Sequence, residues 1–87
     1  MQKYLSGKDA EWVAIFSNNA RFIIREKNSS CAQVARKVGV STYYIRQYVR
    51  GFARPSDEMV QKIADALGCS VDELTDATYA PTNFGSN

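Results

Sequence analysis

The sequence predicts an all-α fold, a compact domain of five short helices packed around one core. Its 87 residues allow a single hydrophobic core, because domains of this length rarely divide. Apolar residues recur at spacings of three and four, the period of an α-helix, and only Gln2–Leu5 has a pattern compatible with a strand. Glycine, serine and proline fall between the periodic segments, where helices end and begin.

The composition argues against several classes of protein. The chain has no histidine, which excludes Ser-His and Cys-His catalysis and histidine-ligated metal sites. Its two cysteines, Cys31 and Cys69, are too few for a disulfide framework or a zinc site. The start of the chain lacks the apolar core of a signal peptide, and no apolar run approaches the roughly 20 residues of a membrane span. We therefore expect a cytoplasmic protein that is not an enzyme and uses no cofactor or metal.

The net charge of +2 conceals two blocks of opposite sign. Residues 16–55 carry eight arginines and lysines against one acid, Glu26, for a net charge of +7. Residues 56–87 carry six acids against Lys62, for a net charge of −5. This asymmetry indicates a directed electrostatic face of the kind that binds nucleic acid, although chance clustering of surface charge explains the blocks equally well.

The first helical segment runs from Asp9 to Lys27, a stretch without proline or glycine in which apolar residues recur at helical spacing. It is either one long helix or two, because Ser17-Asn18-Asn19 supplies side chains that can cap the start of a second helix. Asn28-Ser29-Ser30 then breaks the pattern and offers Ser30 as the next N-cap.

The next two predicted helices flank a tight turn. The first spans residues 31–38 and ends at Gly39, since glycine adopts the left-handed conformation that ends many helices. Ser41 caps the following helix, which spans residues 42–50 and is closed by Gly51. Two helices joined by so short a turn meet at a steep angle. The apolar stripe of the first helix consists of Cys31, Val34, Ala35 and Val38.

Two further helices and a tail complete the predicted architecture. Pro55 and Ser56 begin a fourth helix, whose first turn carries two acids that face the positive end of the helix dipole. This helix ends at Gly68, and Ser70 with Glu73 forms a capping box that opens a short fifth helix. The residues from 75 to 87 lack periodicity and apolar content, so we expect a flexible tail.

The helix over residues 42–50 has two different faces. The face that should pack inward consists of Ile45, Tyr48 and Val49, continued by Phe52. The outer face consists of Tyr43, Arg46, Gln47 and Arg50, with Thr42 beside them and no acid. Arginine, glutamine, threonine and tyrosine are side chains that recognise base edges in the major groove of DNA. The alternative interpretation is the ordinary solvated face of an amphipathic helix.

A set of residues spread over five predicted elements agrees with one family. The set comprises Ala35, Gly39-Val40-Ser41, Ile45, Arg50-Gly51, Pro55-Ser56, residues 63–68 and Ser70-Val71-Asp72-Glu73-Leu74. With these residues the chain resembles the helix-turn-helix domain of the lambda-repressor and Cro-like family, also called XRE-type. The resemblance covers about residues 16–74. It implies a DNA-binding domain at 16–74, preceded by a helical N-terminal extension at 1–15 and followed by the tail at 75–87.

The resemblance also implies sequence-specific binding to duplex DNA, usually by a homodimer on a palindromic operator. The residues expected to contact bases are Thr42, Tyr43, Arg46 and Gln47. The residues expected to contact phosphates are Ser30, Cys31, Arg36, Lys37, Ser41, Tyr44, Arg50 and Arg54. We place the dimer interface on residues 12–16 or on the last helices.

Three positions depart from the family pattern. The family commonly has glutamine after the cap of the second helix, where it contacts a phosphate, and this chain has Cys31. The family usually has a glutamate before Arg50-Gly51, and this chain has Val49. Tyr44 is larger than the residue usual at its position, so we expect Tyr44 to lie against the sugar-phosphate backbone or to cover the second helix. Cys31 is open to two interpretations: a small buried hydrophobic residue, as for Cys69, or a redox-sensitive thiol of lowered pKa at a helix N-terminus.

Two functions agree with these patterns. The first is a stand-alone transcriptional regulator of the phage or mobile-element kind, controlled by its concentration or by a partner protein because the length leaves no room for an effector domain. The second is an antitoxin-like or adaptor protein whose segments outside the family core bind a partner protein. The apolar residues of those segments are Tyr4, Leu5, Trp12, Val13, Ile15, Tyr79 and Phe84. RNA binding is disfavoured, since the exposed helix suits the major groove of B-form DNA.

Overall fold

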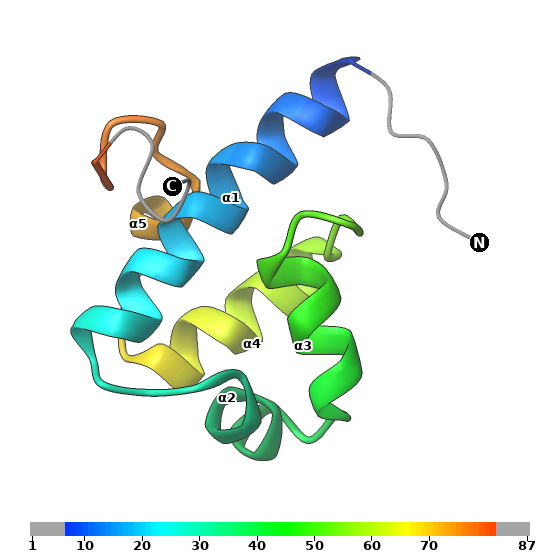
Figure 1. The fold of residues 1–87 in the computed structure, drawn as a ribbon, viewed down its shortest axis with the longest axis vertical. Coiled ribbons are helices and arrows are strands. Elements are labelled where there is room, and N and C mark those ends of the chain that lie inside the picture. The colour runs from blue at the N-terminus through cyan, green and yellow to red at the C-terminus, as the bar shows by residue number, and fades with distance from the viewer. Residues whose placement is uncertain (1–6, 82–87) are drawn as a thin grey trace.

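The computed structural model describes residues 7–81, which form five helices around one core (Figure 1). The helices are α1 (Gly7–Glu26), α2 (Cys31–Val38), α3 (Thr42–Val49), α4 (Asp57–Leu67) and α5 (Val71–Thr75). Residues 7–81 contain no strand, so the predicted all-α, five-helix fold is confirmed, while Gln2–Leu5 lies outside the described residues. No helix in this range is both long enough and apolar enough to cross a membrane.

α1 is one continuous helix of 20 residues, which decides between the two expectations for this segment. Ser17, Asn18 and Asn19 do not cap a second helix, because their side chains hydrogen-bond to backbone groups far along the chain. Ser17 donates to the carbonyl of Val49, and Asn18 donates to the carbonyl of Pro81. The boundary expected after residue 15, between an N-terminal extension and the domain, therefore falls inside α1.

The predicted starts of α2, α4 and α5 are confirmed. At each start a serine side chain accepts a hydrogen bond from the backbone N–H three residues on: Ser30 from Gln33, Ser56 from Met59 and Ser70 from Glu73. Glu73 in return accepts a bond from the backbone N–H of Ser70, which completes the predicted capping box. Ser41 occupies the N-cap of α3 as predicted, but its hydroxyl makes no capping bond.

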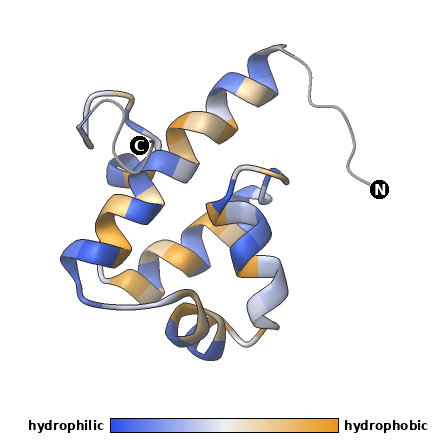
Figure 2. Cartoon of the chain, in the orientation of Figure 1, coloured by the Kyte–Doolittle hydropathy of each residue, from blue (hydrophilic) through white to orange (hydrophobic). Residues whose placement is uncertain are grey.

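The core lies where α1, α4 and the pair α2–α3 meet. Its buried residues come from all five helices and are Phe16, Ala20, Ile23, Val34, Ala35, Ile45, Val49, Val60, Ile63, Ala64, Leu67 and Leu74. Hydrophobic and hydrophilic patches alternate along the helices (Figure 2), as expected where only one side of each is buried. The prediction for Phe52 is wrong, since its side chain is 46% exposed. α3 ends at Val49 and Gly51 has φ +82°, so the chain leaves the helix axis before Phe52.

The segment after α5 differs from the expected flexible tail. Asn19 of α1 is buried and hydrogen-bonds three backbone groups of this region: the carbonyls of Leu74 and Asp76 and the N–H of Ala80. Ala80 is itself buried. Residues 76–81 are thus packed against α1 by polar contacts that leave no periodic apolar pattern in the sequence. Residues 82–87 of the predicted tail lie outside the described residues.

Candidate nucleic-acid interface

α2 and α3 pack against each other on one side of the molecule, and α3 lies along its edge (Figure 1). The turn between them is short because Gly39 adopts φ +91°, a left-handed conformation that glycine reaches without steric cost. The backbone N–H groups of Gly39 and Val40 both donate to the Ala35 carbonyl, at 2.8 and 3.1 Å. These bonds fix a helix–turn–helix arrangement in which one face of α3 points away from the core.

The four residues expected to contact bases lie together on α3. Tyr43 is 62% exposed and Arg46 is also exposed, whereas Thr42 and Gln47 are half-buried. α3 contains no acidic residue, so its outer surface offers guanidinium, amide and hydroxyl groups without a competing negative charge. Such a surface complements the donors and acceptors that base pairs present in the major groove.

Two adjacent tyrosines form the first turn of this surface. The rings of Tyr43 and Tyr44 pack edge to face, with centroids 5.5 Å apart and planes at 77°. Tyr44 is 53% exposed, which favours a place against the sugar-phosphate backbone over burial against α2. The pair therefore exposes aromatic surface at the N-terminal end of α3.

The start of α2 adjoins the last turn of α3. Burial raises the pKa of the Cys31 thiol, and the positive charges of Arg46 and Arg50 lie near enough to oppose that rise. A thiol of raised pKa is a poor nucleophile, so Cys31 fits the interpretation of a small, half-buried hydrophobic residue. Ser30 and Ser41 are exposed at the two N-caps. Residues 7–81 hold no cluster of side chains arranged to bind a metal ion.

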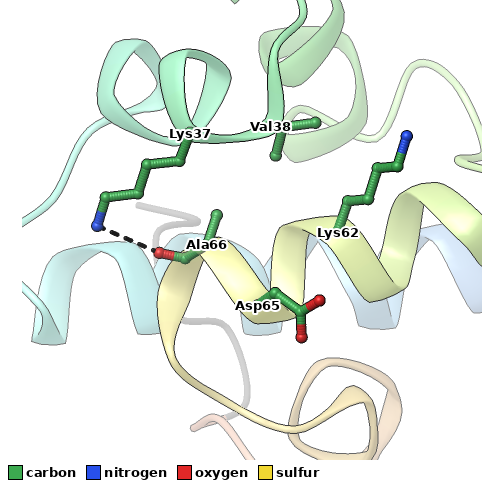
Figure 3. Close-up of a pocket in the computed structure, with 5 residues that line it drawn as sticks. All are labelled: Lys37, Val38, Lys62, Asp65 and Ala66. Atoms are coloured by element: carbon green, nitrogen blue, oxygen red, sulfur yellow. Dashed lines mark hydrogen bonds between the residues drawn. The ribbon is translucent and has the colours of Figure 1, made fainter.

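Lys37 points toward α4 rather than toward α3. Its ammonium group donates to the carbonyl of Ala66 at 3.5 Å, and its side chain lines a pocket with Val38, Lys62, Asp65 and Ala66 (Figure 3). The last carbonyls of a helix carry partial negative charge, so this is a favourable place for a cation. Lys37, Arg36 and Arg50 are all exposed, but the expected phosphate role of Lys37 competes with this surface contact to α4.

Arg54 makes two contacts with α1 that the sequence did not indicate. Its guanidinium carbon lies 3.9 Å from the centroid of the Trp12 ring, and its Nε lies 4.0 Å from Oδ1 of Asp9. Trp12 in turn stacks on Phe16, with centroids 5.3 Å apart. The Arg54 side chain remains 35% exposed, so part of the guanidinium group stays accessible to a phosphate.

Two further residues of α1 contact the end of α3. Ser17 and Arg21, one helical turn apart, both donate to the backbone carbonyl of Val49. The sequence pattern assigned Ser17 to a cap and Arg21 to the basic block, because no local signal identifies a partner 32 or 28 residues away. Ser17 and Arg21 are four residues apart, so they lie on the same side of α1. This spacing is the signal in the sequence that could have indicated a shared partner.

Comparison with known proteins agrees with this geometry. The HTH_3 family, described as helix-turn-helix, matches residues 23–74, which is more than half of the chain. The chain belongs to this helix-turn-helix family. The resemblance predicted from the sequence is thereby confirmed.

A phage repressor is similar in sequence to this helix-turn-helix chain. The chain is similar to the transcriptional repressor RstR of the cryptic phage CTXphi from Vibrio cholerae, with 43% identity over 47 residues. The matched segment is 54% of this chain and 42% of RstR, so the chain spans less than half the length of that relative.

Two solved structures have the same fold. The hypothetical transcription factor NHTF from Neisseria has a TM-score of 0.71 and 21% identity over 86% of each chain, a likeness that concerns the fold alone. The restriction-modification controller protein C.AhdI from Aeromonas hydrophila has a TM-score of 0.68 and 26% identity, over 71% of this chain and 94% of that one. The helix-turn-helix assignment therefore holds in sequence and in structure.

Proposed function

We propose that this helix-turn-helix protein is a transcriptional regulator that binds duplex DNA sequence-specifically, with α3 in the major groove. The observation that carries the proposal is the acid-free outer face of α3, where Tyr43, Arg46 and Gln47 lie together beside the start of α2. An α-helix fits the major groove, and these side chains complement base edges. The family match, the phage repressor and the controller protein support a DNA-binding transcriptional regulator, and these relatives are named as regulators rather than as enzymes.

Within this proposal one group of site residues contacts bases and a second group contacts the sugar-phosphate backbone. Those assigned to bases are Thr42, Tyr43, Arg46 and Gln47. Those assigned to the sugar-phosphate backbone are Ser30, Cys31, Arg36, Lys37, Ser41, Tyr44, Arg50 and Arg54. At the start of α2, backbone N–H groups and the positive end of the helix dipole favour a phosphate. Backbone contacts position the protein, and base contacts give it a preferred sequence.

We further propose that the protein acts in the cytoplasm as a homodimer on a palindromic operator. A single α3 contacts only a few base pairs, which is too little for selective binding among the many sites of a genome. The similarity to a phage repressor favours repression of a phage or mobile-element promoter.

Several residues that the adaptor hypothesis offers to a partner protein are used inside the fold. Val13 is buried, and Trp12 lies beneath the guanidinium group of Arg54. Tyr79 packs edge to face on Phe22, with ring centroids 6.0 Å apart, and its side chain stays 40% exposed. Tyr4, Leu5 and Phe84 lie outside the described residues. The contacts of Val13 and Trp12 leave fewer apolar side chains available to a partner protein than the adaptor hypothesis assumes.

Selection of binding sites from random duplex DNA tests the proposal. We expect the wild-type protein to enrich a consensus with two-fold symmetry, and we expect sizing of the purified complex to give two protomers per site. A variant with both Arg46→Ala and Gln47→Ala is the matched control and should enrich a weaker or altered consensus. If the wild-type protein enriches no duplex sequence, the proposed function is wrong.

A further inference from the structure

The end of α3 has one carbonyl that its own turn does not satisfy. A helix leaves its last four carbonyls without partners inside the helix. Three of those in α3 accept from the residues that follow: Arg46 from Arg50 N–H at 2.9 Å, Gln47 from Phe52 N–H at 2.9 Å and Tyr48 from Gly51 N–H at 3.2 Å. The remaining carbonyl, that of Val49, has no such local donor.

α1 supplies the donors for the Val49 carbonyl. Ser17 Oγ donates to it at 2.7 Å, and Arg21 Nη1 donates to it at 3.1 Å. Arg21 Nη1 also lies 2.7 Å from Ser17 Oγ, so the two side chains and the carbonyl form one cluster. The cluster places a cation at the negative end of the α3 dipole, where it is most favourable.

The backbone just after α3 also lies close to α1. A Cβ atom added to Gly51 would lie 3.6 Å from Ser17 Cβ and 3.7 Å from Val13 Cγ1, so the space between this turn and α1 is about the size of one methyl group. Gly51 has φ +82°, which a larger residue adopts only with strain. The end of α3 is therefore fixed against α1 by the two hydrogen bonds to the Val49 carbonyl, and the backbone that follows turns away through Gly51.

Fixing this end of α3 determines where its outer side chains lie. Arg46 and Arg50 belong to the last turn and the C-cap of α3, within one helical turn of the carbonyl that Arg21 and Ser17 hold. Hydrogen bonds require donor–acceptor distances near 3 Å, so a small rotation of this end would displace Arg46 from its base and Arg50 from its phosphate. The Nε of Arg21 is buried without a hydrogen-bond partner among residues 7–81, a cost that the fold tolerates in order to place the guanidinium group there.

From these contacts we infer that Arg21 and Ser17 are positioning residues for DNA recognition: they orient the recognition helix by holding the Val49 carbonyl, without touching DNA themselves. The inference rests on the proposed function. It also extends the DNA-binding unit beyond residues 23–74, the segment that matches the family, because Ser17 and Arg21 both precede that segment.

The test compares affinity for the selected site with affinity for random duplex DNA. Arg21→Met keeps the length of the side chain and removes its charge and donors. We expect the ratio of the two affinities to fall about tenfold, as for the loss of one bidentate base contact. Arg21→Lys keeps a cation and a donor for the carbonyl and should restore the ratio to within about threefold of wild type. Ser17→Ala removes one of the two donors, and we expect a fall of about threefold.

The controls separate positioning from stability and from charge. Lys8→Met removes one positive charge from an exposed position of the same helix and should leave the ratio unchanged. Melting temperatures are measured for all variants, and if Arg21→Met does not fold, Ser17→Ala and Arg21→Lys carry the test.

A lower melting temperature with an unchanged ratio would reduce Arg21 to a structural residue. An equal loss on both DNAs with a smaller salt dependence would make it a phosphate contact, and in either case the inference fails. A wild-type protein without any preferred site would instead overturn the proposed function, and this inference with it.

Discussion

Arg46 and Gln47 are neighbours on α3, yet they suit different bases. Arginine donates two hydrogen bonds to guanine, whereas glutamine both donates and accepts at adenine. Arg46 is exposed and Gln47 is half-buried, so more of the Arg46 side chain is accessible to a base. The two residues therefore give the proposed complex two independent base contacts rather than one shared contact.

Alanine substitution of either residue tests its role as a base contact. Arg46→Ala or Gln47→Ala should cost about 1–3 kcal/mol of binding free energy on the preferred site and much less on random DNA, because the lost bond exists only with the correct base. Titrations of both duplexes with each variant measure this difference. Equal losses on the two duplexes would remove the substituted residue from the base-contacting set.

Arg54 tests the phosphate contacts separately. Arg54→Ala should weaken binding to specific and random DNA alike. It should also make the negative slope of log K against log salt shallower by about 0.9 per subunit, because each neutralised phosphate releases about one counterion. Asp9→Asn is the control: it removes the carboxylate partner at 4.0 Å and leaves the guanidinium group in place. That variant should not reduce the slope and should lose under about 1 kcal/mol of stability. An unchanged slope together with a lower melting temperature for Arg54→Ala would limit Arg54 to its contacts with α1.

At the scale of single elements, the helix boundaries could be predicted from the sequence and the tertiary role of α1 could not. The capping bonds of Ser30, Ser56 and Ser70 close within three residues, so the chain segment itself contains donor and acceptor. Ser17 and Asn19 carry the same chemistry, but their partners lie 32 and 55 residues away. The hydrogen-bond partner of a hydroxyl or amide cannot be predicted from the sequence when packing brings that partner from a distant segment. For this reason the contacts of residues 76–81 with α1 could not be predicted either.

Asn19 should be the most important polar residue for the stability of the packed segment after α5. Asn19→Ala leaves buried carbonyls without a donor and should lower the free energy of unfolding by about 2–3 kcal/mol. Asn18→Ala removes one exposed bond to the Pro81 carbonyl and should cost under about 1 kcal/mol. Urea unfolding of both variants measures the difference. Similar midpoints for the two variants would show that the Asn19 bonds contribute little.

The turn between α2 and α3 depends on the backbone of Gly39. An added Cβ would have no heavy atom within 4 Å, so Gly39→Ala probes only the cost of φ +91°. We expect a loss of about 1–2 kcal/mol, which lowers the melting temperature of a domain of this size by about 4–16 °C. Gly7→Ala is the matched control, because its Cβ would also meet nothing within 4 Å but its φ is not positive. A melting temperature as high as that of the control would contradict the strain argument.

At the scale of the whole molecule, size and charge limit how copies can lie on DNA. Residues 7–81 measure 31 × 29 × 24 Å, close to the roughly 34 Å that separates successive major grooves on one side of the duplex. Two copies one turn apart would therefore fit side by side on one face of the duplex without overlapping. The acidic residues of α4 and α5 belong to the opposite charge block from α3, which favours an orientation with α3 toward DNA.

The spacing of half-sites follows from these dimensions. We expect two half-sites about 10 base pairs apart, each bound by one protomer. Insertion of about 5 base pairs between them turns one site to the other side of the duplex and should abolish cooperative binding. Titrations on such a spacer series, with the stoichiometry of each complex, measure the effect. One protomer per minimal specific site would contradict the dimer.

The bonds of Asn19 also impose an order on synthesis. Its partners Leu74 and Ala80 follow it by 55 and 61 residues, and translation at about 5–20 residues per second leaves α1 without them for roughly 3–12 seconds. During that interval α1 to α4 leave the ribosome before α5 and residues 76–81 can cover α1. Folding of residues 7–81 is therefore completed only after residues 76–81 have been translated, and until then the side of α1 that they and α5 cover is available to chaperones and proteases.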